Sequence, residues 1–284
     1  NGIVERVLAP QVYMRVAEGD LRADGTLMAG NEVRMSLQGD LANSGTIFGR
    51  RISDIRAENI GNSGRIGSSG LTALTARQDI TSSGAIDGAE VRLEAGRDVN
   101  LTTQTSSSTG KNASRTSVDR VTGINAGQLL QVSAGRDITL AGAQVSGGGT
   151  LMLDAARDLN LQTVNVAESI NIAWDARNRL ATASSAELGS TVKAAGNITL
   201  KAGQDVNARA AYVTSRGGAI GAAAGRDIVI TNGVATSRLE ERRSVTGRVG
   251  AQHRPDRRDL LLEIGHPAAH VPTPRPESIP GTRV

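Results

Sequence analysis

The 284-residue sequence contains no cysteine, three histidines and only four aromatic residues. Without cysteine the chain has no disulfide, no thiolate metal site and no cysteine nucleophile. The histidines are His253, His266 and His270, so residues 1–252 supply neither an imidazole base nor a histidine-ligated metal. We therefore expect no cofactor, no metal and no catalytic residue in this chain.

Long apolar runs and an excess of one charge are also missing. No window approaches the ~20 consecutive apolar residues that a membrane helix needs. The chain has 32 basic and 28 acidic residues, and the residues from Thr236 onward hold nine arginines and six acids, which leaves 23 basic and 22 acidic residues in 1–235. This nearly neutral body offers no phosphate-binding face, so we do not expect nucleic acid as a partner.

Proline is scarce except at the end of the chain, where six of the seven prolines lie in 255–280. This composition predicts that residues 251–284 form a disordered, Pro/Arg-rich tail. The same change in composition is also expected of a gene fragment whose last forty residues are read in another frame.

What the sequence does contain is an internal repeat. The clearest copies read Ala-Gly-Arg-Asp followed by alternating apolar residues, and they cover 95–101, 134–140 and 224–230. The repeat unit is about twenty residues, because the Asp or Asn that opens each copy recurs at positions 20, 40, 59, 79 and 98. The intervals from 98 to 137 and from 158 to Asn197 are each 39 residues, so we expect each to hide one divergent copy.

Within a copy the apolar residues alternate with polar ones, as in a half-buried strand. Val91, Leu93 and Ala95 point one way, and Arg92 and Glu94 point the other. A unit of this length cannot bury its own apolar face, so copies must stack. The sequence predicts an all-β fold, a right-handed parallel β-helix (β-solenoid) of about 20-residue coils.

The recurring Arg-Asp pair has two interpretations, a ligand site or a structural ladder. A short Asp side chain can accept hydrogen bonds from turn amides, and an Arg in the same column can bridge to the carboxylate one coil away. Function seldom requires the same pair in every layer, so we favour the structural interpretation. The expected turn ladder comprises Asp20, Asp40, Asp79, Arg97, Asp98, Arg136, Asp137, Arg157, Asp158, Asp205, Arg226 and Asp227.

Two stretches depart from the repeat, and they shape the expected domain organisation. Residues 1–235 should form the shaft, with divergent or excursion segments at 102–129 and at 162–190, which contains Trp174. Residues 236–250 should start a further repeat or excursion. Excursions are where a solenoid usually carries binding, because the rod only positions them.

A carbohydrate-active β-helix enzyme remains an alternative. Such an enzyme would use paired carboxylates or arginines in a groove. Sugar clefts also tend to need aromatic platforms, and this body has only Tyr13, Phe48, Trp174 and Tyr212.

The repeat units, together with Gly-Ala-Gln-Val-Ser-Gly-Gly-Gly at 142–149, resemble the filamentous haemagglutinin family of large Gram-negative exoproteins exported by two-partner secretion. The resemblance runs from about residue 11 to 247 and includes 237–243, which is similar to the start of a family excursion. It implies a β-helix shaft that is secreted or held at the bacterial surface and serves adhesion or contact-dependent growth inhibition. The implied partners are an outer-membrane two-partner transporter and a receptor, carbohydrate among the candidates, on a host or neighbouring cell. It implies no catalytic residue here, and the family's secretion and toxin domains are not recognisable.

Overall fold

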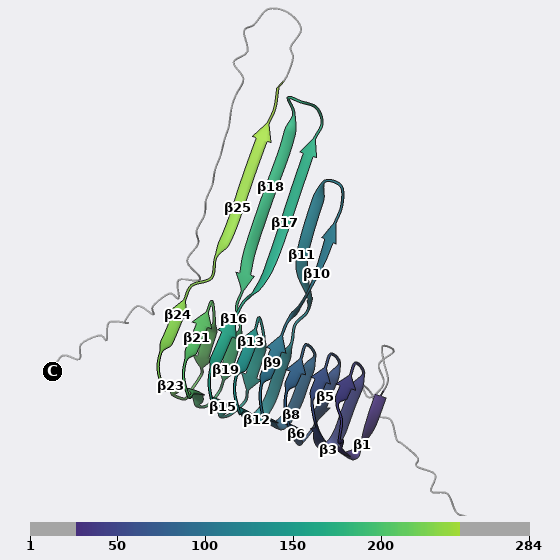
Figure 1. Cartoon of the computed structure of the whole chain (residues 1–284), viewed down its shortest axis with the longest axis vertical. Coiled ribbons are helices and arrows are strands. Elements are labelled where there is room, and N and C mark those ends of the chain that lie inside the picture. The colour runs from purple at the N-terminus through teal and green to yellow at the C-terminus, as the bar shows by residue number, and fades with distance from the viewer. Residues whose placement is uncertain (1–26, 245–284) are drawn as a thin grey trace, which may run out of the picture.

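The regular structure of this chain is built from short parallel strands stacked at intervals of one repeat. The computed structural model describes residues 27–244, and all of the regular elements there are strands. Val91, Leu93 and Ala95 are buried and pair in register with Leu130, Val132 and Ala134 of the next coil. The predicted parallel β-helix of about 20-residue coils is thus confirmed (Figure 1).

Each coil has three faces. One twelve-stranded sheet covers the first two faces, because its long strands bend from one face to the other, and an eight-stranded sheet forms the third face. The strands that run through the first and second faces are β1 (Leu27–Ser36), β3 (Thr46–Ala57), β8 (Ala85–Ala95) and β12 (Gly123–Ala134). Those confined to the first face are β5 (Arg65–Ser68), β14 (Gln144–Gly147), β19 (Thr191–Ala194) and β22 (Tyr212–Ser215). Those confined to the second face are β6 (Leu71–Ala76), β15 (Leu151–Ala155), β20 (Ile198–Ala202) and β23 (Ile220–Ala224). The third face consists of β2 (Leu41–Asn43), β4 (Ile60–Asn62), β7 (Ile80–Ser82), β9 (Val99–Thr102), β13 (Ile138–Ala141), β16 (Leu159–Gln162), β21 (Val206–Arg209) and β24 (Ile228–Thr231).

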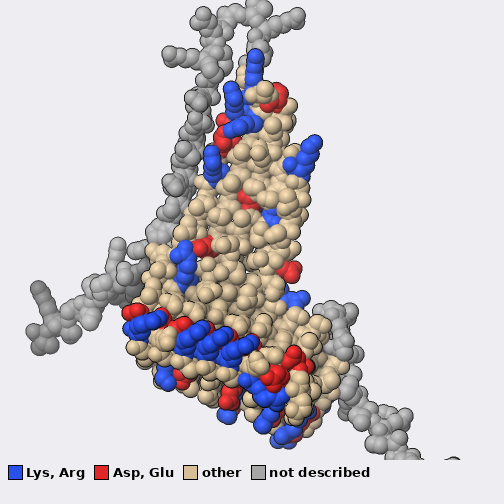
Figure 2. Space-filling view, viewed as in Figure 1, with Lys and Arg blue, Asp and Glu red and all other residues tan. Residues whose placement is uncertain are grey.

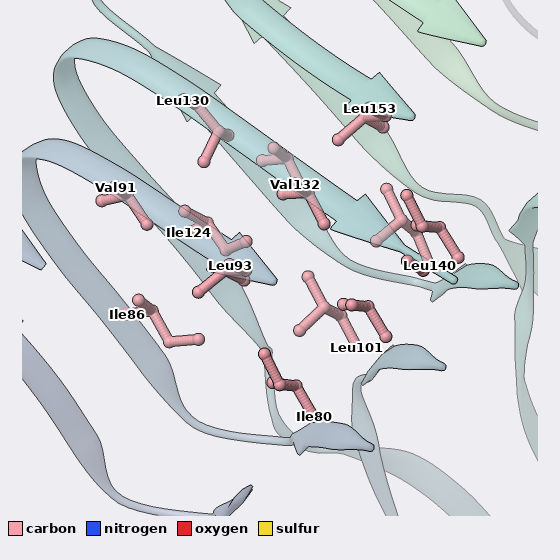
Figure 3. Close-up of a cluster of buried hydrophobic side chains, with 14 of the residues drawn as sticks. Ile80, Ile86, Val91, Leu93, Leu101, Ile124, Leu130, Val132, Leu140 and Leu153 are labelled. Atoms are coloured by element: carbon pink, nitrogen blue, oxygen red, sulfur yellow. The ribbon is translucent and has the colours of Figure 1, made fainter. Parts of the chain in front are cut away.

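The core is one aliphatic column inside the coils. Figure 3 shows Ile86 and Ile124 from the first face, Leu93 and Val132 from the second, and Leu101 from the third, all pointing into the same interior. These side chains are at most 1% exposed. A thin coil has room for small branched side chains, which accounts for the near absence of aromatic residues.

Five further strands leave the rod and form a separate antiparallel sheet, which we call the lateral sheet. It runs in the order β10 (Gln104–Thr109), β11 (Ala113–Arg120), β17 (Val164–Ala173), β18 (Arg179–Leu188) and β25 (Ala235–Arg242). Figure 1 shows it standing away from the coils. Residues 123–129 belong to the rod strand β12.

The lateral sheet overturns one prediction about the repeat. The intervals of 39 residues do not hide divergent coils, since β9 pairs directly with β13 and β16 pairs directly with β21. The additional residues are the hairpins β10–β11 and β17–β18. Asn197 is also not equivalent to the Asp positions, because Ile198 pairs with Leu151 on the second face.

The last coil of the described rod has apolar residues on its open side. Ile220, Ile228 and Ile230 are 48%, 46% and 80% exposed. No helix within residues 27–244 is long and apolar enough to cross a membrane. The predicted tail at 251–284 and Asp20 lie outside the described residues.

Candidate functional site

A column of Asp and Asn side chains runs along the corner between the second and third faces. In each coil before the last described one, a carboxylate or amide oxygen accepts a hydrogen bond from the backbone N–H of the corresponding residue in the next coil. Asp98 Oδ1, for example, lies 3.2 Å from Asp137 N, and Asp137 Oδ1 lies 3.2 Å from Asp158 N. The column consists of Asp40, Asn59, Asp79, Asp98, Asp137, Asp158, Asp205 and Asp227. It satisfies turn amides that the strands cannot reach.

Arginines neutralise this column. The guanidinium of Arg136 donates through Nε, at 2.8 Å, and through Nη2 to the two oxygens of Asp98. Arg97, Arg157 and Arg226 pair in the same way with Asp79, Asp137 and Asp205. These hydrogen bonds lower the pKa of Asp79, Asp98 and Asp205 below the ordinary value for Asp. The predicted ladder residues within 27–244 thus lie in one stripe, which Figure 2 shows as adjacent basic and acidic groups along the rod.

All three excursions leave the rod at one place, the corner between the third and first faces. They follow β9, β16 and β24, whereas the intervening strands β13 and β21 are each joined to the first face by two residues. From β9 onward, excursions and tight turns therefore alternate from coil to coil.

This alternation has a geometric cause. A hairpin contributes two strands to the lateral sheet, and neighbouring strands lie about 4.8 Å apart. Neighbouring coils of the rod are separated by the same distance, because they are also paired strands. One hairpin is therefore as wide as two coils, and hairpins on alternate coils can join edge to edge. The pairing of β11 with β17 and of β18 with β25 shows that they do.

The two tight turns that lie between excursions have an unusual backbone. Gly142 has a φ of 60° and Ala210 a φ of 49°. A Cβ on Gly142 would lie 2.7 Å from Cγ2 of Val164, at the base of the neighbouring hairpin. The base of the neighbouring hairpin therefore lies against this turn, whose length of two residues is also that of the turns between β4 and β5 and between β7 and β8.

One face of the lateral sheet is lined by hydroxyl groups that hydrogen-bond across the strands. The pairs are Ser107–Thr116 at 2.9 Å, Ser114–Ser169 at 2.7 Å and Ser185–Thr236 at 2.7 Å. The last two pairs join different excursions. Such cross-strand pairs stabilise a sheet that no other element within residues 27–244 covers.

A groove of about 500 Å³ lies where the lateral sheet meets the rod, lined by residues such as Val121, Leu188 and Val234. Its one titratable lining residue is Glu187, whose Oε2 is 2.8 Å from Arg209 Nη2 and 2.8 Å from Val234 N. The hydrogen bond from Arg209 lowers the pKa of Glu187. A single ion-paired carboxylate does not provide the two carboxylates that glycoside hydrolysis needs. In the part of the chain that the structure describes, no group of three or more His, Cys, Asp or Glu could hold a metal ion.

Reasoning from the sequence missed the lateral sheet as a unit. Its strands Ala113–Arg120 and Val164–Ala173 pair although about fifty residues separate them. The one sequence signal for these strands is that the repeat is interrupted where they occur. Trp174 lies in the turn between β17 and β18, at the outer end of the second hairpin.

Comparisons with known proteins agree with this architecture. The model of the hemagglutinin repeat matches residues 77–171 and 176–254. The chain is 31% identical over 229 residues to the tRNA nuclease CdiA of Yersinia mollaretii, which covers 71% of this chain and 7% of the relative. It is 30% identical over 223 residues to the tRNA nuclease CdiA of an Escherichia coli strain, and this match covers 74% of the present chain and 7% of that relative. Toxin CdiA of Yersinia pestis is 29% identical over 207 residues, and this match covers 69% of the present chain and 6% of that relative.

No solved structure matches the chain. The chain spans about 7% of the length of the first of these relatives. Because the repeat model matches more than half of its residues, the chain belongs to the hemagglutinin-repeat family of filamentous exoproteins.

Proposed function

We propose that this chain is a shaft segment of a secreted growth-inhibition filament, in which the rod sets distance and the lateral sheet presents a surface for contact with another cell. The observation that supports this proposal is the lateral sheet. A spacer needs only coils, whereas this chain places three excursions on alternate coils so that they form one continuous sheet.

The ladder of Asp and Arg serves the rod. Its four Arg–Asp pairs recur along one corner of the rod, and the paired carboxylates of Asp79, Asp98, Asp137 and Asp205 each accept a guanidinium and a turn amide. We therefore assign these residues to the stacking of coils rather than to a ligand.

The relatives favour the growth-inhibition filament over a simple adhesin. Those compared carry the names tRNA nuclease CdiA or Toxin CdiA, and this segment matches a small part of each. Export would require an outer-membrane two-partner transporter, and contact would require a receptor on the neighbouring cell. An adhesin of the same family is the second candidate, favoured by the hemagglutinin repeat itself.

Limited proteolysis of intact cells tests the proposal. Lys111 lies in the exposed turn of the hairpin β10–β11, at the outer part of the lateral sheet. Trypsin added to the source bacterium should cut the natural protein at this turn when the transporter gene is present and leave it intact when that gene is deleted. A Lys111→Gln variant is the matched control for cleavage at this site.

A protein that trypsin never reaches on intact cells would contradict the proposal and favour a gene fragment. Loss of growth inhibition of neighbouring cells on deletion of 104–120, with surface exposure unchanged, would support contact through the lateral sheet. Cleavage of a polysaccharide by the purified chain would instead favour the carbohydrate-active enzyme.

A further inference from the structure

The two faces of the lateral sheet differ in chemical character. Successive side chains of a strand point to opposite faces, and residues opposite each other in register share a face. Ser169 and Ser185 belong to the hydroxyl-lined face, so the even-numbered residues of β17 and β18 lie on the other one. We call this other face the apolar face, because its aliphatic side chains are Val164, Val166, Ile170, Ile172, Leu180 and Leu188.

No element within residues 27–244 packs on the apolar face. The five strands of the lateral sheet pair only with one another, and Figure 1 shows them as a single layer away from the rod. Leu188 is 39% exposed, and Leu239 of the edge strand β25 is 44% exposed. Val164 and Leu188 also line the groove at the rod, so the aliphatic surface continues into that groove. A sheet with one aliphatic and one polar face is half of a two-layer structure.

We propose that the second layer is the lateral sheet of a second copy of this chain, packed face to face on the apolar face as in a β-sandwich. Two sheets packed in this way lie about 10 Å apart. A two-fold axis along the direction of the rod places the two rods at opposite ends of the sandwich and keeps them parallel. Two filaments that leave the same cell surface side by side have this parallel orientation.

The size of the apolar face fits a dimer. Its five strands average about eight residues, so the sheet measures roughly 24 by 27 Å and offers on the order of 650 Å². Two copies together would bury on the order of 1,300 Å², and stable protein interfaces bury about 1,200–2,000 Å². The lateral sheet is therefore large enough to hold two copies together without a further contact.

The charges on the apolar face are complementary to those of a second copy. Arg115 of β11 and Glu168 of β17 lie opposite each other in register, near the middle of the sheet. A two-fold axis along the rod brings the same two strands of the partner over this pair, so each cation can meet the partner's anion diagonally. A lipid bilayer fits the face less well, because both charges would then enter hydrocarbon.

The dimer goes beyond the proposed function and does not depend on it. In the sandwich the hydroxyl-lined face of each sheet points outward. It therefore stays available for contact with another cell. Loss of the dimer would leave the shaft function standing, since cleavage at Lys111 on intact cells tests that function separately.

The absence of cysteine makes a direct test possible, because a single introduced thiol is then the only one in the chain. Ser184 and Ser185 are adjacent exposed residues of β18 that lie on opposite faces. In the complete 284-residue chain, Ser184→Cys should be joined into a covalent dimer by a short bismaleimide cross-linker, whereas Ser185→Cys should remain monomeric. Equal yields of dimer from the two variants, including none from either, would overturn the face-to-face packing.

Sedimentation equilibrium of the unmodified chain measures the dimer directly. We expect a reversible dimer, and Ile172→Glu should raise its Kd at least about a hundredfold, because the two-fold axis places the buried carboxylate in the interface twice. Asn171→Glu introduces the same charge on the opposite face of β17 and should leave the Kd unchanged. Circular dichroism should show that the β-structure of both variants persists. A chain that is monomeric at about 100 μM would overturn the proposal, since interfaces of this size bind at about micromolar Kd or tighter.

Two further outcomes would give the apolar face to a different occupant and overturn the dimer. The first is a monomer in which a simple maleimide reacts more slowly with Ser184→Cys than with Ser185→Cys. That result would assign the cover to residues 245–284 of the same chain. The second is a chain that floats with phosphatidylcholine vesicles and loses this binding in Ile172→Glu but not in Asn171→Glu. That result would assign the face to a lipid surface.

Discussion

Arg136 donates two hydrogen bonds to the carboxylate of Asp98, although 38 positions separate the two residues in the chain. The intervening residues include the whole hairpin β10–β11, so these partners meet only when the coil closes around the excursion. The side chain of Asp98 is only 12% exposed, less than that of Asp79, Asp137 or Asp205. Asp98 is therefore the ladder position at which loss of the carboxylate should matter most.

We expect Asp98→Ala to lower the free energy of unfolding by about 1–3 kcal/mol, because the turn amide of Asp137 and the guanidinium of Arg136 both lose their acceptor. Urea denaturation followed by circular dichroism measures the change. Asp227→Ala is the matched control, since the side chain of Asp227 is 68% exposed and caps no further amide in the described chain. It should change stability by less than about 0.5 kcal/mol. Equal losses for both variants would contradict a structural ladder.

The same ladder predicts how stability depends on pH. Hydrogen bonds from Arg97, Arg136 and Arg226 lower the pKa of the paired carboxylates of Asp79, Asp98 and Asp205. Their contribution is therefore fully present above the pKa of about 3.9 of an unfolded Asp, and it is lost as the pH falls through the lower pKa of the folded state. The urea midpoint should stay level near neutral pH and drop below about pH 4. A midpoint that does not fall in acid would argue against these ion pairs.

The tight turn at Gly142 should tolerate no side chain. Gly142→Ala places a Cβ in the left-handed region and 2.7 Å from Val164, so we expect a loss of about 1–3 kcal/mol in unfolding free energy. Gly221→Ala is the control, because no atom lies within 4 Å of the added Cβ in β23. There the substitution should be neutral or slightly stabilising. Similar losses at the two positions would show that the corner is not constrained by its neighbouring hairpins.

The spacing of the hairpins can be tested by removing one coil. Deletion of residues 137–157, which runs from one ladder position to the residue before the next, places the two hairpins on adjacent coils. Two strands cannot fit in the width of one coil, so we expect the pairing of β11 with β17 to be lost while the rod persists. Hydrogen exchange should then become fast at Ala113–Thr116 and stay slow at Leu130–Ala134. If the amides of Ala113–Thr116 remained protected from exchange, the argument that one hairpin is as wide as two coils would be refuted.

The sequence predicted the rod because its signal is local. The alternation at Val91, Leu93 and Ala95 is read directly from neighbouring residues, and it is confirmed by their burial. The Arg and Asp positions of one corner could be aligned for the same reason.

The lateral sheet could not be predicted in this way, because its pairing joins strands far apart in the chain and its first strand has no apolar alternation of its own. Gln104–Thr109 is polar throughout and exposed on all sides, so it does not resemble the strands of the rod. The sequence pattern does not distinguish Asn197 from the ladder positions, because both corners place a polar residue before an aliphatic strand. Only the pairing of Ile198 with Leu151, which joins residues 47 apart, distinguishes the two corners.

The equal width of one hairpin and two coils limits how such a filament can change in length. If recombination between repeats adds or removes whole coils, each event leaves the aliphatic column of the rod continuous. The lateral sheet stays continuous only when the number of coils between two excursions changes together with the number of hairpin strands that fill the gap. The unit that can be added or removed without breaking the outer surface is therefore a pair of coils with its hairpin, whereas a change of a single coil would break that surface and spare the fold beneath it.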